Sequence, residues 1–204
     1  MMTQVLPGCE SLAAHEPTPE EVEGQFFPTP DKLAEAGVRL LLAHGDYQSG
    51  TCVDLGAGDG ALCQALLRAG MPRAGVCAVE RRSECAPRLE AVAEVVFIAD
   101  ALSSWDADFD LAILNPPYAQ TTAFATAALK LAPRVAMLAL FQWAATEGGL
   151  AVFAERPARI YPCRPRPDFT GKGNNPREHA WYLWERGLRQ TTIEGPLYWQ
   201  AVQP

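Results

Sequence analysis

The residues best suited to chemistry in this chain are four consecutive ones, Asn115, Pro116, Pro117 and Tyr118. They follow residues 109–114, an apolar run with the length and composition of a buried strand. The prolines fix φ and lack N–H groups, so this corner is stiff and rich in carbonyls. The Asn115 amide oxygen and the Pro116 carbonyl can each accept one N–H of a bound amino group, and the Tyr118 ring can stack on a flat group. The alternative is an ordinary strand-ending turn, since Asn-Pro and Pro-Pro are common loop signals.

A glycine-rich turn upstream predicts a second part of the same site. Residues 51–55 have the pattern of a short buried strand, Gly56-Ala57-Gly58-Asp59-Gly60 follows, and residues 61–69 have a helical pattern. Strand, glycine-rich turn and helix form the first unit of a doubly wound α/β domain. The glycine spacing differs from the G-x-G-x-x-G of nicotinamide sites, and Asp54 before it favours a ligand with a charged amino group.

Two further predicted strands end in acidic residues. Residues 76–79 lead into Glu80, where a carboxylate can bind both hydroxyls of a ribose, and residues 95–99 lead into Asp100. Open α/β sheets bind ligands at the carboxyl ends of their strands. The four strand ends together therefore predict one site at one edge of a mostly parallel sheet.

With these motifs the chain resembles class I S-adenosylmethionine-dependent methyltransferases, most closely the DNA adenine-N6 methyltransferases. The resemblance covers roughly residues 25–145, and Phe26-Phe27-Pro28-Thr29-Pro30 resembles the family's first cofactor motif, which gives the gamma order of motifs. It implies a Rossmann-like fold and S-adenosyl-L-methionine as the cofactor. The cofactor residues that it implies are Phe27, Thr29, Pro30, Asp54, Gly56, Ala57, Gly58, Glu80, Asp100 and Ala101.

The same resemblance implies methyl transfer to an amino nitrogen, with N6 of adenine in DNA as the expected acceptor. Asn115, Pro116, Pro117 and Tyr118 are then the catalytic residues, and Tyr118 stacks on the base with its ring face, which leaves its hydroxyl without a role. Asn-Pro-Pro-Tyr also occurs in enzymes that methylate RNA adenine or protein glutamine, so both stay open. A catalytically idle binding subunit with this fold is a further alternative. A target-recognition domain of normal size does not fit after the matched region.

The charge distribution bears on whether the expected partner is a nucleic acid. The net charge is −7, which argues against broad electrostatic binding of nucleic acid. Within residues 156–177, however, six basic residues and one acid, Asp168, give +5. This segment is rich in Pro and Gly and is expected to be a long loop that contacts phosphate, or else a solvated loop. The basic residues are Arg156, Arg159, Arg164, Arg166, Lys172 and Arg177, of which the last four are the expected substrate contacts.

Composition predicts one cytoplasmic α/β domain over residues 25–204, preceded by a disordered acidic tail over 1–24. No signal peptide or membrane span is expected, and the pattern leaves the oligomeric state open. The six cysteines lack C-x-x-C pairing and are expected to be reduced. His15, His44 and His179 lack ligand spacing, so no metal is expected.

The pattern also predicts individual elements of the second half. A helix over 121–131, a strand over 135–141, a helix over 146–154, an edge strand over 158–161 and an aromatic strand over 179–184 are expected. Trp181 and Trp184 are expected in the core rather than as stacking platforms. Near the N-terminus, Asp31 is expected to cap a helix that starts at Lys32.

Overall fold

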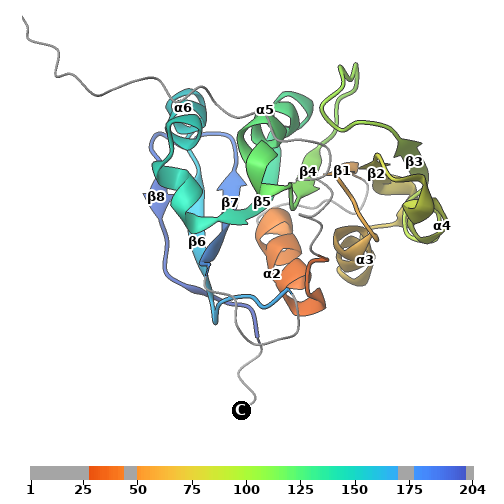
Figure 1. Cartoon of the computed structure of the whole chain (residues 1–204), viewed down its shortest axis with the longest axis horizontal. Coiled ribbons are helices and arrows are strands. Elements are labelled where there is room, and N and C mark those ends of the chain that lie inside the picture. Colours follow the sequence, from red (N-terminus) through yellow and green to blue (C-terminus); the bar gives the residue numbers. More distant parts are fainter. Residues whose placement is uncertain (1–27, 44–49, 170–176, 201–204) are drawn as a thin grey trace, which may run out of the picture.

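The computed structural model describes residues 28–43, 50–169 and 177–200. The predictions for Phe27, Lys172 and the tail over 1–24 lie outside these residues. In the described part, the expected doubly wound, mostly parallel sheet is confirmed (Figure 1). None of the described helices is both long and apolar enough to span a bilayer.

Nine described strands form the sheet, in the order β3-β2-β1-β4-β5-β7-β6-β8, with β9 also paired to β6. The first five strands run parallel, whereas β7 is antiparallel to both β5 and β6. The bounds are β1 Cys52–Leu55, β2 Val76–Glu80, β3 Val95–Ile98, β4 Leu111–Leu114, β5 Arg134–Leu140, β6 Arg159–Arg164, β7 His179–Trp184, β8 Thr192–Ile193 and β9 Leu197–Tyr198.

Helices cover both faces of the sheet, with α2 and α3 on one face and α5 and α6 on the other (Figure 1). The bounds are α2 Asp31–Leu42, α3 Ala61–Arg68, α4 Ala86–Leu89, α5 Thr121–Leu131 and α6 Glu147–Glu155. Short 3₁₀ turns occupy Arg73–Gly75, Ser83–Cys85, Tyr118–Gln120 and Phe141–Ala145.

Two apolar layers hold the sheet between these helices. Side chains alternate along each strand, so Val53 and Leu55 pack towards α5, whereas Cys52 packs towards α2 and α3. The central strands β1, β4 and β5 are buried along their whole length. Such burial on both faces explains why these strands are apolar over most of their length in the sequence.

The first helix differs from expectation at its start. Asp31 does not cap it: α2 begins at Asp31 itself, and the carbonyl of Pro30 accepts from the backbone N–H groups of Leu33 and Ala34, each at 2.9 Å. Further along, Gly37 faces the ring of Trp181, and a Cβ at this position would lie 2.2 Å from a ring carbon. Glycine therefore lets α2 lie directly on β7.

The last strands also differ from expectation. The strand predicted over 158–161 is β6, which continues to Arg164 and is not an edge, since Ile160 pairs with Ile193 of β8 and Cys163 with Leu197 of β9. The strand predicted over 179–184 is confirmed as β7. Trp181 and Trp184 are fully buried, which confirms their place in the core.

Candidate active site

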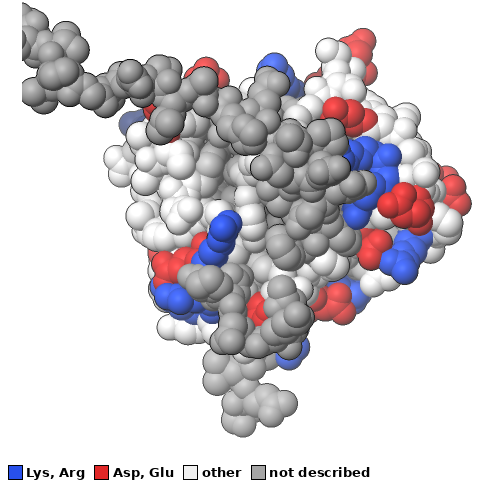
Figure 2. Space-filling model, in the orientation of Figure 1, with Lys and Arg blue, Asp and Glu red and all other residues white. Residues whose placement is uncertain are grey.

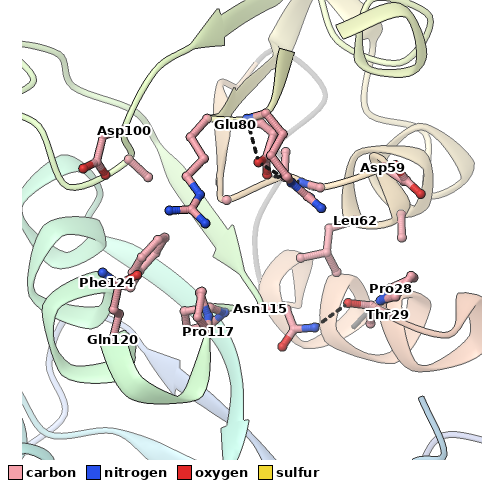
Figure 3. A pocket seen from close by; sticks show the side chains of 18 of the residues that line it. Pro28, Thr29, Asp59, Leu62, Glu80, Asp100, Asn115, Pro117, Gln120 and Phe124 are labelled. Carbon is pink, nitrogen blue, oxygen red and sulfur yellow. Dashed lines mark hydrogen bonds and ion pairs between the residues drawn. The ribbon is translucent and has the colours of Figure 1, made fainter. Parts of the chain in front are cut away.

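A cavity lies at the carboxyl ends of β1, β2, β3 and β4, where the strand-end series predicted it (Figure 3). Loops that follow four different strands therefore meet around one space. Its lining comprises Pro28, Thr29, Gly56, Ala57, Gly58, Asp59, Ala61, Leu62, Glu80, Arg81, Arg82, Asp100, Ala101, Asn115, Pro116, Pro117, Tyr118, Gln120 and Phe124.

The glycine-rich turn forms one wall of this cavity. Gly56, Gly58 and Gly60 all have positive φ, of 77°, 56° and 84°, a conformation that other residues rarely adopt. Gly60 ends the turn as the N-cap of α3, so the turn delivers the chain directly into the helix. This arrangement brings bare backbone to the ligand side of the sheet, where side chains would otherwise keep a ligand away.

Glu80, at the end of β2, is held by its neighbours on both oxygens. Its Oε2 accepts from the backbone N–H of Gly58 at 2.8 Å, and its Oε1 accepts from Arg82 Nε at 2.9 Å. Burial raises the pKa of Glu80, but the hydrogen bonds from Arg82 and Gly58 outweigh burial, so the pKa lies below its usual range. The side chain is therefore a fixed carboxylate at the rim of the glycine-rich turn.

Asp54 lies in β1 and does not line the cavity. It is fully buried, and its Oδ2 accepts from Cys63 Sγ at 3.4 Å. Its Oδ1 has no hydrogen-bond partner among the described residues. Burial raises the pKa of Asp54 to about 7. The expected contact of Asp54 with a ligand's amino group stays a prediction.

The other expected cofactor residues also divide into those that line the cavity and those that do not. Asp100, Ala101 and Thr29 line the cavity, whereas Pro30 lies outside it as the N-cap of α2. The Asp100 carboxylate accepts from the backbone N–H of Leu102 at 2.9 Å, which shapes the loop after β3.

The corner after β4 is built around Asn115. Its Nδ2 donates to Thr29 Oγ1 at 2.9 Å, and the amide oxygen points away from Thr29 (Figure 3). The next residues, Pro116 and Pro117, also line the cavity. This contact joins two segments 86 residues apart, so the first motif orients the amide of the last one.

Tyr118 has a partner that residue pattern alone did not assign. Its hydroxyl lies 3.0 Å from Nε2 of His179, the first residue of β7. His179 is buried at 1% exposure. Neither residue type nor spacing indicates this contact, because the two residues are 61 positions apart.

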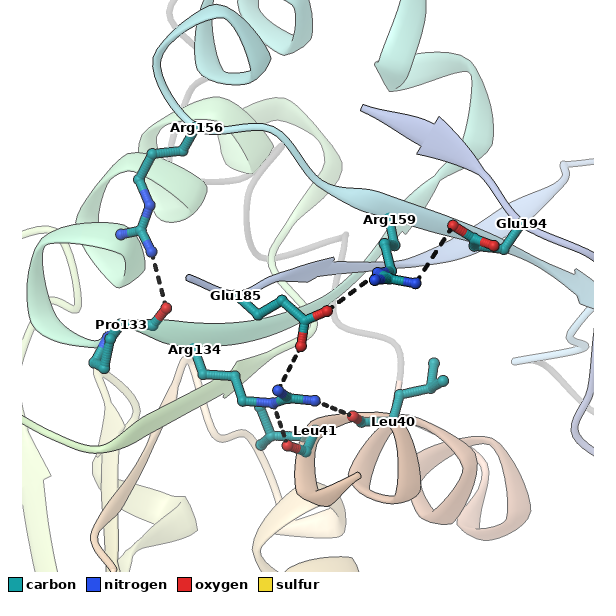
Figure 4. Close-up of polar contacts among 8 residues, drawn as sticks. All are labelled: Leu40, Leu41, Pro133, Arg134, Arg156, Arg159, Glu185 and Glu194. Carbon is teal, nitrogen blue, oxygen red and sulfur yellow. Dashed lines mark hydrogen bonds and ion pairs between the residues drawn. The ribbon is translucent and has the colours of Figure 1, made fainter. Parts of the chain in front are cut away.

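The basic segment over 156–177 is not one long loop, because β6 occupies its first part. Arg156 donates to the carbonyls of Leu129 and Pro133, and Arg159 pairs with Glu185 at 3.1 Å (Figure 4). β6 carries Arg159 at its amino end, and this end lies away from the cavity because β6 runs in the same direction as β5. Arg156 and Arg159 are therefore part of the framework.

The arginines at the other end of β6 lie on the cavity side of the sheet. Arg164 and Arg166 each pair with Glu178 at 3.3 Å, and the guanidinium of Arg177 lies 5.5 Å from the centre of the Tyr118 ring. None of the three lines the cavity itself. Glu178 lies one residue beyond the predicted basic segment and reduces the positive charge of that segment. On the face shown in Figure 2, described acidic and basic side chains lie intermixed.

Several cavity residues were not predicted from the sequence. Arg81 and Arg82 directly follow Glu80, and Gln120 and Phe124 follow the corner after β4, near the start of α5. Their proximity in sequence to the motifs is the signal that could have identified them. Asp59, Ala61 and Leu62 likewise continue the glycine-rich turn.

Comparisons with known proteins agree with this geometry. A predicted O-methyltransferase from Agrobacterium tumefaciens is 24% identical, with a TM-score of 0.60 over 82% of this chain and 86% of that one. A protein from Pyrococcus horikoshii, provisionally described as an RNA methyltransferase, is 21% identical, with a TM-score of 0.61 over 83% and 89%. The type I restriction-modification methyltransferase subunit from Streptococcus thermophilus is 15% identical, with a TM-score of 0.66 over 83% and 47%. No curated protein matches significantly.

At these identities the structures show a shared fold, and the family rests on the sequence itself. The family model of the methyltransferase small domain matches residues 31–142, which is more than half of the chain and includes both the glycine-rich turn and the corner after β4. The chain therefore belongs to the methyltransferase small domain family and is a methyltransferase, with S-adenosylmethionine as its cofactor.

Proposed function

We propose that the protein transfers a methyl group to an amino nitrogen, and that its acceptor is N6 of adenine in DNA. The observation that carries this proposal is the corner after β4. There the Asn115 amide is oriented by Thr29, and Pro116 and Tyr118 lie beside it around the same cavity.

The residues of the cavity fit the cofactor. Glu80 is a buried carboxylate of lowered pKa, suited to accept from the two hydroxyls of a ribose. The glycine-rich turn offers bare backbone for close approach. Asp100 and Ala101 would hold the adenine end, and Thr29 the opposite side near Asn115. When bound, S-adenosylmethionine supplies an electrophilic methyl group on a sulfonium.

The corner provides acceptors rather than a strong base. The Asn115 amide oxygen and the Pro116 carbonyl each accept one N–H of the substrate amino group, which directs its lone pair and favours the positive charge that develops on nitrogen. After transfer the methylated ammonium is acidic and loses its proton to solvent. An amino acceptor therefore suits this corner.

A flat base suits the rest of the corner. The Tyr118 ring can stack on a base that has left the helix, which offsets part of the unstacking cost of a few kcal/mol. Arg177 beside this ring, and Arg164 and Arg166 beyond it, supply positive charge for phosphate on the same side of the sheet. The likeness to a restriction-modification methyltransferase subunit agrees with a DNA acceptor.

The test is transfer of a tritiated methyl group to separate pools of DNA, RNA and protein. We expect label on N6 of adenine in DNA. Label on RNA adenine or on glutamine would overturn the acceptor while keeping the amino-nitrogen chemistry. Absence of transfer to all three pools, with cofactor binding intact, would instead favour an idle binding subunit.

Asn115→Ala examines the corner directly. Cofactor affinity should change little, whereas methyl transfer should fall by roughly a hundredfold or more, the scale for losing one preorganised polar group. Gln64→Ala, which removes an exposed amide from α3, is the matched control and should keep full activity. If Asn115→Ala retains full methyl transfer, the corner after β4 is an ordinary strand-ending turn without a catalytic role.

A further inference from the structure

The contact between Tyr118 and His179 joins the catalytic corner to the last half of the sheet. The two rings lie 5.8 Å apart between centroids and are tilted by 47°, and the Tyr118 hydroxyl is 3.0 Å from His179 Nε2. His179 reaches this position because β7 is antiparallel to β5, which places its first residue opposite Leu140, the last residue of β5.

The hydrogen bond has a defined direction. His179 Nδ1 lies 3.2 Å from the backbone carbonyl oxygen of Arg177, and a carbonyl can only accept, so Nδ1 carries the proton. Nε2 is then the acceptor, and the Tyr118 hydroxyl donates to it. Burial lowers the pKa of His179 to about 4, and the nearby charge of Arg177 also acts to lower it, which keeps the ring neutral at physiological pH.

The surroundings hold both rings. The Phe169 ring lies 4.9 Å from that of His179, and the Arg177 guanidinium lies 5.5 Å from the centre of the Tyr118 ring. The Tyr118 backbone carbonyl accepts from Thr121 Oγ1 at 3.0 Å. Tyr118 is thus held at its backbone and, through the hydroxyl, at the far end of its side chain.

We propose that His179 is a positioning residue for methyl transfer, because it accepts a hydrogen bond from the Tyr118 hydroxyl and thereby fixes the plane of the ring on which the target base stacks. This inference rests on the proposed stacking role of Tyr118. A ring anchored only at Cα can swing, and the base that stacks on it would move relative to Asn115. Small misplacements of reacting groups cost a large part of the rate.

The inference predicts that Tyr118→Phe and His179→Leu have equal and non-additive effects. Each should lower kcat about tenfold, which corresponds to about 1.4 kcal/mol, with KM for the cofactor unchanged. The double variant should lose no more than either single one, because both remove the same bond. His179→Gln should recover most of the loss, since its amide oxygen can accept from the hydroxyl.

Tyr182→Phe is the matched control on the same strand. Its hydroxyl donates to the backbone carbonyls of Leu140 and Phe141, so its loss loosens β5 and β7 without touching Tyr118. We expect its effects to add to those of His179→Leu. Full kcat in His179→Leu, or additive losses in the Tyr118–His179 double variant, would overturn the inference.

Ring nitrogen NMR of His179 gives a readout that does not depend on activity. The wild type should show a protonated Nδ1 and an unprotonated Nε2 whose resonance shifts in Tyr118→Phe but not in Tyr182→Phe. A protonated Nε2 would overturn the inference whatever the acceptor is. If the labelled methyl group reaches RNA or protein instead of DNA, the proposed acceptor fails, and the same variants are compared on the acceptor that is methylated.

Discussion

Two acidic side chains near opposite ends of the strands have opposite surroundings. Glu185, at the edge away from the cavity, accepts from Arg134 at 2.6 Å and pairs with Arg159 at 3.1 Å. Asp54, behind the glycine-rich turn, is fully buried, and the hydrogen bond that it accepts comes from the thiol of Cys63. One carboxylate is neutralised by the framework, and the other keeps an unpaired oxygen among the described residues.

Each of the two regions also has an arginine paired with a carboxylate, but the two arginines have different surroundings. Arg134 donates to Glu185 and also to the carbonyls of Leu40 and Leu41, so it closes the C-terminal end of α2 (Figure 4). At the cavity edge, by contrast, the guanidinium of Arg82 pairs with Glu80 in the cavity wall itself. Polar groups are satisfied where they support the fold, whereas the ligand edge keeps polar groups where a ligand can reach them, as functional sites commonly do.

The largest expected effect lies at the framework edge. Arg134→Met should destabilise the protein by about 3–5 kcal/mol, because it leaves Glu185 and the end of α2 without their buried donor. Cofactor affinity of the folded protein should stay unchanged. Denaturant unfolding and calorimetry measure the two quantities. Arg39→Met, on the exposed face of α2, is the control and should cost less than about 0.5 kcal/mol.

Removing the charge of arginines on the cavity side, or at the opposite ends of the strands, tests which of the two regions contacts DNA. Changing Arg164, Arg166 and Arg177 to Gln should flatten the salt dependence of DNA binding by about 0.9 log units for each phosphate that the protein no longer neutralises. The matched triple change of Arg159, Arg186 and Arg189 removes the same charge at the opposite edge and should leave the slope nearly unaltered. Equal slopes in both triple variants would mean that the cavity-side arginines do not contact phosphate.

Glu80→Gln tests whether the paired carboxylate in the cavity binds the cofactor. Cofactor affinity should fall tenfold or more, on the order of 1.4 kcal/mol, because a charge-assisted acceptor for the ribose is removed. Glu94→Gln removes an exposed carboxylate that pairs with Arg73 and should bind normally. Calorimetric titration with S-adenosylmethionine compares them, and equal affinities would remove Glu80 from the cofactor site.

The effect of Asp54→Asn on stability depends on pH. The pKa of Asp54 is raised in the folded state, so between its unfolded value near 3.8 and about pH 7 the folded protein binds more protons than the unfolded chain. Its contribution to stability is therefore full below pH 3.8 and is lost as the pH rises towards 7. Relative to the wild type, Asp54→Asn should gain about 3 kcal/mol between pH 4.5 and pH 8, since each unit of the pKa shift corresponds to about 1.4 kcal/mol.

Unfolding curves at these two pH values measure that difference, and Asp110→Asn serves as a control at an exposed carboxylate. The same Asp54→Asn protein should bind S-adenosylmethionine more weakly if Asp54 meets the ligand's amino group. A variant whose stability relative to the wild type is independent of pH would contradict a buried carboxyl of raised pKa.

Much of the fold was predictable because its signals are local. The runs that became β1, β2 and β4 are apolar over most of their length, and each ends in the residues that carry chemistry. The rule that parallel strands share a ligand edge then brings Gly58, Glu80 and Asn115 together without further information. The family model covers this same region.

The sequence by itself thus determined the cavity, its glycine-rich turn and the corner after β4, because each lies at a strand end with its own motif. Only the tertiary structure decided the rest. The direction of β7 placed His179 on Tyr118, and β6 sent Arg159 to the framework edge and Arg164 to the ligand edge. These outcomes depend on which strands pair and in which direction, and an antiparallel pairing between distant segments leaves no local pattern in the chain.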